Sequence, residues 1–157
     1  MGHSVTALLG TQAALSAFAA KEEVGPPVQA KADVWLLPLP EEAIDKIVGL
    51  PVGTAIEGFN YLFPKLLAKL ELASANDWIV YAETEYFGGT GGQGAVALRR
   101  GGILYGPTSA EWGCINQALA SVGIKVAPPA QDEFETIGFD THRFTEDWLP
   151  ESEDGDA

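Results

Sequence analysis

Residues 78–105 read WIVYAETEYFGGTGGQGAVALRRGGILY, and this stretch decides the fold that we expect. Residues 78–86 are rich in aromatic and β-branched side chains, which favour a strand. Two shorter apolar runs, 95–99 and 103–105, flank Gly101-Gly102. Because two strands around a glycine pair are typical of a hairpin with a primed turn, this half of the chain predicts an antiparallel sheet.

Helical patterns lie on both sides of this stretch. Apolar spacing, N-capping residues such as Thr11 and Ser109, and acids in a first turn indicate four helices. They are expected at residues 12–20, 41–49, 59–72 and 110–122. Pro64 lies inside the third pattern, so that helix is either kinked there or begins near Phe63 with Pro64 in its first turn.

Two further strands are expected near the N-terminus, at residues 4–9 and 34–39, on either side of the first helix. They are compatible with a βαβ unit, although Pro38 pushes the second strand toward a sheet edge. We therefore expect one α+β domain over residues 1–149, with a three- to five-stranded, mostly antiparallel sheet packed with helices. Residues 150–157 contain four acids and are expected to form a solvated tail.

Charge and cysteine content limit the function classes. The chain has 157 residues, with 22 Asp and Glu against 9 Lys and Arg, so its net charge is −13. This charge argues against binding to nucleic acid or to a membrane surface. Residues 5–20 are apolar like the core of a signal peptide, but no Lys or Arg precedes them. Cys114 is the only cysteine, which excludes an internal disulfide and favours a cytoplasmic location.

A glycine-rich string follows the predicted central strand. The string 89–94 satisfies G-x-G-x-x-G, yet a strand pattern follows it where a dinucleotide-binding unit needs a helix. We expect a flexible hairpin loop or, as an alternative, a loop whose backbone amides hold an anion or small ligand. No cofactor is expected. The loop residues are Gly88, Gly89, Gly91, Gly92 and Gly94.

Glu83 and Glu85 are the best candidates for catalytic residues. They project from the same face of the predicted strand, about 7 Å apart, a spacing that suits general acid–base chemistry or a shared cation. The alternative is that they belong to a solvated sheet face. A nucleophilic pair of Cys114 with His142 is a weaker possibility, since Cys114 suits a packed helix. Two histidines and one cysteine predict no metal site.

Acidic and aromatic residues alternate in the C-terminal third. Such a surface suits a basic protein partner, because charge speeds the encounter and a few aromatic side chains anchor the contact. The residues expected to bind this partner are Asp132, Glu133, Phe134, Glu135 and Trp148. The alternative is a charged flank that only keeps the protein soluble.

Four segments carry a resemblance to a group of small bacterial proteins of unassigned function. They are EYFGGTGGQGA at 85–95, INQAL at 115–119 with VGI at 122–124, DEF at 132–134, and EDWL at 146–149. The chain resembles this group over residues 78–149. The resemblance implies a bacterial origin and assigns no activity or site.

Two functions are therefore expected from the sequence. The first is a non-catalytic, acidic protein-binding domain that engages a basic protein, in the manner of an immunity protein or antitoxin. The alternative is a small enzyme, or a small-ligand or cation-binding module, that uses Glu83 and Glu85 beside the glycine-rich loop. The oligomeric state is left open.

Overall fold

The computed structural model describes residues 2–88 and 90–149, so the predicted tail at 150–157 lies outside the described residues. In this part of the chain, six strands form one sheet in the order β2-β3-β1-β4-β5-β6, and all neighbouring strands are antiparallel. The strands are β1 (Thr6–Gly10), β2 (Val28–Gln29), β3 (Trp35–Pro38), β4 (Ile79–Phe87), β5 (Thr90–Arg99) and β6 (Gly102–Ala110). The α+β class is confirmed, with one strand more than the predicted upper limit.

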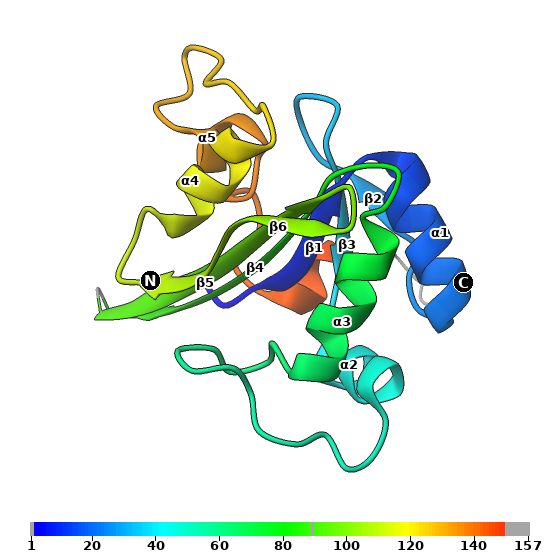
Figure 1. Ribbon diagram of the computed structural model, residues 1–157. Coiled ribbons are helices and arrows are strands. Elements are labelled where there is room, and N and C mark those ends of the chain that lie inside the picture. Colours follow the sequence, from blue (N-terminus) through cyan, green and yellow to red (C-terminus); the bar gives the residue numbers. More distant parts are fainter. Residues whose placement is uncertain (1, 89, 150–157) are drawn as a thin grey trace, which may run out of the picture.

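The helices form two layers, one on each face of the sheet (Figure 1). One layer consists of α1 (Gln12–Glu22), α2 (Glu41–Val48) and α3 (Pro64–Ala73). The other consists of α4 (Cys114–Ser121), α5 (Glu133–Thr136) and the 3₁₀ helix η1 (Thr145–Trp148). Strand residues alternate between the layers: Tyr81 packs with the first, and Val80 and Ala82 pack with the second.

The predicted βαβ unit is wrong, because β1 and β3 are antiparallel neighbours. The two-residue strand β2, for which the sequence pattern predicted no strand, precedes β3 and pairs with it in the antiparallel direction. Ala32 and Asp33 make the turn between these strands with positive φ angles of 58° and 62°. Alanine rarely adopts this conformation, so the composition of the turn gave no signal for it.

Helix boundaries follow the capping residues more closely than the apolar spacing. The Thr11 side chain accepts a hydrogen bond from Ala14 N–H at 3.2 Å and begins α1. Pro64 occupies the first turn of α3, so the second of the two predicted alternatives is confirmed. The helix expected at 110–122 begins only at Cys114, because Ser109 and Ala110 extend β6 and pair with Gly94 and Gln93.

The two hairpins of the second half join β4 to β5 and β5 to β6. Strand β5 returns to β6 through Arg100 and Gly101, whose φ angles are 57° and 78°. Two central residues with positive φ are typical of a type I′ turn, which confirms the predicted primed hairpin.

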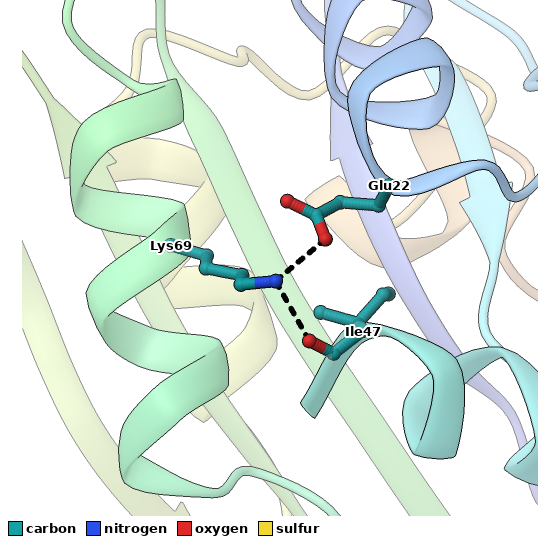
Figure 2. Close-up of polar contacts among 3 residues, drawn as sticks. All are labelled: Glu22, Ile47 and Lys69. Atoms are coloured by element: carbon teal, nitrogen blue, oxygen red, sulfur yellow. Dashed lines mark hydrogen bonds and ion pairs between the residues drawn. The ribbon is translucent and has the colours of Figure 1, made fainter. Parts of the chain in front are cut away.

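Lys69 connects the three helices of the first layer through one ion pair and one hydrogen bond. Lys69 Nζ on α3 lies 2.7 Å from Glu22 Oε1 at the end of α1 and donates at 2.7 Å to the carbonyl oxygen of Ile47 on α2 (Figure 2). The Glu22 side chain is 8% exposed, so this contact is shielded from solvent more than an ordinary surface pair. Among the described residues, no helix combines the length and apolar composition that a membrane span requires.

Candidate functional site

Glu83 is a buried carboxylate on β4, 5% exposed, and three donors from the protein surround it. Its Oε2 accepts from Asn60 N–H at 2.7 Å, and its Oε1 accepts from Tyr61 N–H at 3.1 Å and from the Tyr81 hydroxyl at 2.7 Å. Burial, and then the charge of Glu83, raise the pKa of Tyr81 well above its usual value, so this phenol remains a donor. Glu83 therefore fixes the segment before α3 onto the sheet.

Glu85 lies two residues further along the same face and is exposed. Its Oε1 accepts from the Asn60 side-chain amide at 3.1 Å. The prediction that both glutamates share one face is thus confirmed, and Asn60 contacts both. Only Glu85 remains accessible, because both oxygens of Glu83 are occupied by donors.

The two glutamates line a cleft of about 570 Å³. It lies between the segment before α3 and the end of the sheet where β4 and β6 finish and β5 begins. A third carboxylate, Glu111, also lines it, and the lining contains no Lys or Arg. Phe87 lies in the wall with 56% of its surface exposed, and Trp112, next to Glu111 in the chain, is 76% exposed. The cleft is therefore negatively charged, with exposed aromatic side chains at or beside it.

Residues 90–94 of the glycine-rich string form strand rather than the expected flexible loop, and the predicted loop residue Gly89 lies outside the described residues. Positions 90–94 belong to β5, where Gly92 pairs with Glu85 and Gly94 with Glu83. Gly88 lies in the turn, and Gly91 has a φ of 142° with no room for a Cβ beside the carbonyl of Glu85. At Gly94 the missing side chain leaves room for the Phe59 ring, and at Gly92, which lines the cleft, a Cβ would lie 3.0 Å from the carbonyl oxygen of Ala110.

Tyr61 lies at the centre of a wider acidic surface. Burial raises the pKa of Tyr61, and the negative charges of Glu41, Glu85, Glu83 and Glu146 raise it further, in that order. Glu41 and Glu146 line a second hollow of about 180 Å³ that also includes Tyr61. We call this surface the Tyr61 face; its residues are Glu41, Tyr61, Glu83, Glu85 and Glu146.

The acidic residues predicted to bind a partner lie on the opposite side of the sheet, around α5. Asp132 caps α5 by accepting from Glu135 N–H at 2.8 Å, and Glu135 accepts in return from Gln131 N–H at 2.8 Å. Asp132 also accepts from the Asn116 amide at 3.3 Å. Glu133 is half-buried. These carboxylates hold their own helix in place and remain at least partly accessible.

The two aromatic residues of that prediction contribute to the core. Phe134 is half-buried, with its ring 4.9 Å from that of Phe139 and 5.4 Å from that of His3. Trp148 is 6% exposed and packs edge-on against His142, with the ring centres 4.7 Å apart. Of the predicted anchors, Phe134 is thus partly accessible at this surface and Trp148 is covered.

His3, in the segment before β1, is half-buried and packs against Phe134 and Phe139 of the second layer. Its Nε2 donates to the carbonyl of Phe139 at 3.0 Å, and its Nδ1 lies 2.6 Å from the Thr84 hydroxyl. Burial lowers the pKa of His3, so the neutral ring is favoured. The residue therefore holds the segment before β1 against β4 and the loop after α5.

Nucleophile and metal chemistry find little support in the geometry. Burial raises the pKa of the Cys114 thiol, which lies 3.4 Å from the carbonyl oxygen of Gln93, and His142 packs on Trp148 instead. A raised pKa keeps a thiol protonated and poorly nucleophilic. Across residues 2–88 and 90–149, no three His, Cys, Asp or Glu side chains form a group that could hold a metal ion.

Sequence reasoning did not predict four of the site residues: Glu41, Tyr61, Glu111 and Glu146. Tyr61 lies in an irregular segment far from β4 in the chain, and its hydrogen bond to Glu83 and the burial of Phe59 and Leu62 hold that segment on the sheet. The charge of the segment around η1 was the one available signal for Glu146. Comparison of the chain with protein-family models, with curated proteins and with solved structures finds no match.

Proposed function

We propose that this protein is a non-catalytic binding domain whose acidic surface engages a basic protein, in the manner of an immunity protein or antitoxin. The observation that supports this most directly is the Tyr61 face, where an accessible aromatic ring lies among four carboxylates. Within the described residues, Lys69 and Glu22 form the only ion pair. The carboxylates of the Tyr61 face therefore lack a cation of their own.

Glu83 strengthens this surface although it is itself buried. Its three donors are two amides and a hydroxyl, none of which carries a positive charge. The negative charge thus remains, and its field is screened less than that of a carboxylate in water. An Arg or Lys side chain against the Tyr61 ring would gain both this attraction and a cation–π contact.

A small-ligand or cation-binding module is the second candidate, because one cleft contains both Glu83 and Glu85. Its volume of about 570 Å³ suits a small molecule. Acid–base catalysis by the pair is less well supported, since both oxygens of Glu83 accept hydrogen bonds from the fold. We therefore place protein binding first.

The test compares two charge reversals that change the net charge equally. Tagged wild-type protein is used to capture partners from a lysate of the source organism, and the association rate constant of the captured protein is then measured. Variant Glu85→Lys/Glu146→Lys alters the Tyr61 face, and variant Glu133→Lys/Glu135→Lys alters the surface around α5. All four side chains are exposed or half-buried, so both variants are expected to fold.

We expect a basic protein to be captured, and the Glu85/Glu146 variant to associate with it at least about tenfold more slowly. The Glu133/Glu135 variant should slow association less. Raising the salt concentration should slow association of the wild type, because the steering charges are screened beyond about 8 Å. If a neutral or acidic protein is captured, or if both variants associate like the wild type, the proposal is wrong.

A further inference from the structure

A groove of about 370 Å³ runs between α1 and α3 on the outer side of the first helical layer. Its walls are mainly apolar, and the large apolar side chain most exposed in them is Leu72, at 71%. Small residues of α1 border it, so another helix could approach closely. The apolar lining residues are Ala13, Ala14, Ala17, Phe18, Leu72 and Ala73.

The two ends of this groove carry opposite charge. Helices α1 and α3 run in opposite directions (Figure 1), and the ion pair of Lys69 with Glu22 joins the end of α1 to the middle of α3 (Figure 2). Lys21 lies at that end, and Asp77 lies at the other, where α3 leads into β4. Lys69 is neutralised by Glu22, whereas Lys21 and Asp77 form no ion pair within the described residues.

We propose that this groove is the interface of a homodimer, in which α1 and α3 of two copies pack about a two-fold axis. In such an interface each contact occurs twice, so Lys21 of each copy faces Asp77 of the other. Leu72 of each copy enters the groove of its partner and is removed from water. Two chains with a net charge of −13 repel each other, and the opposite charges at the two ends of this groove reduce that repulsion locally.

The dimer leaves the Tyr61 face free. None of the residues that line the groove lines either of the two acidic hollows. The proposal is therefore independent of the proposed function, and either can fail without the other.

The test is a pair of single charge reversals, Lys21→Glu and Asp77→Lys, followed by sedimentation of each variant at about 0.15 M salt from about 1 µM to about 1 mM protein. We expect the wild type to form dimers as concentration rises, and each single variant to dimerise at least about tenfold more weakly, because like charges then meet. An equimolar mixture of the two variants should recover dimers, since a mixed pair restores both opposite-charge contacts.

Three further variants keep the result unambiguous. Asp77→Asn removes the charge but can keep the 2.8 Å hydrogen bond from Trp78 N–H, so it separates charge from local folding. Lys65→Glu makes the same charge change on α3 outside the groove and should leave dimerisation unchanged. Leu72→Glu should abolish it. A wild type that is monomeric at every concentration, a dimer that survives Leu72→Glu, or a mixture that stays monomeric overturns the proposal.

Discussion

At the residue scale, Glu83 is a buried carboxylate whose hydrogen-bond donors are all uncharged. A buried carboxylate is costly unless its oxygens accept hydrogen bonds, and the amides of Asn60 and Tyr61 and the Tyr81 hydroxyl meet that need. The same hydrogen bonds attach an irregular segment to the sheet and place Tyr61 beside the acidic cleft. The residue thus connects stability to the geometry of the proposed binding surface.

Replacing Glu83 by Gln is expected to destabilise the protein by about 1–3 kcal/mol, because an amide NH₂ would then face a backbone N–H donor. The matched change Glu85→Gln should alter the free energy of unfolding by less than about 0.5 kcal/mol, since Glu85 is exposed. Urea unfolding of both variants measures the difference. Equal stability of the two variants would show that the hydrogen bonds of Glu83 add nothing to the fold.

The shared face of Glu83 and Glu85 could be predicted from the sequence, because side chains alternate strictly along a strand. Which of the two is buried could not. That difference depends on Asn60 and Tyr61, which lie more than twenty positions away and precede α3, inside the range 59–72 that was expected to be helical. Long-range hydrogen bonds of this kind leave no local trace in composition.

At the scale of elements, β5 shows why a glycine-rich segment need not be a loop. Gly92 and Gly94 pair with Glu85 and Glu83 of β4. The Phe59 ring packs over Gly94, and its centre is 6.1 Å from that of Tyr81. The sequence showed the glycines but not the ring that needs the space. A flexible loop was therefore the wrong expectation for residues 90–94.

We expect Gly94→Ala to destabilise the protein by about 1–3 kcal/mol, because the new Cβ would lie 2.5 Å from Phe59 Cε2 and displace the ring. Gly102→Ala is the control: it is also in a strand, and its nearest neighbour would be the Arg99 carbonyl oxygen at 3.9 Å. That change should leave stability unchanged or raise it by up to about 1 kcal/mol. Thermal unfolding of both variants tests this, and a neutral Gly94→Ala would mean that Phe59 does not pack as tightly as the structure indicates.

The helices also show how far local sequence signals predict the boundaries of elements. The Thr11 cap, the acids in the first turn of α2 and Pro64 predicted the starts of α1, α2 and α3, since these signals are local. The start of α4 was placed too early, because β6 pairs with β5 as far as Ala110 and takes those residues from the helix. Strand pairing overrides a helical pattern wherever the ladder continues.

For the whole molecule, the surface charge is distributed unevenly, although apolar clusters cover both faces of the sheet. Apolar clusters on both faces of the sheet hold the layers together, while the carboxylates lie outside with little local compensation. The groove between α1 and α3 carries lysines, and the Tyr61 face carries none among its defining residues. Folding therefore proceeds against repulsion that a basic partner would relieve.

Salt should reveal this repulsion directly. We expect the melting temperature to rise by about 2–4 °C between about 20 mM and about 500 mM NaCl, which corresponds to about 1 kcal/mol of screened repulsion. The control combines the four reversals at Glu85, Glu133, Glu135 and Glu146 to Lys; each changes the charge by two, so together they reduce −13 to −5. This variant should show a clearly smaller rise, because less repulsion remains to be screened. An equal rise in both proteins would assign the salt effect to general salting-out, and a fall in the wild type would show that attractive pairs outweigh the repulsion.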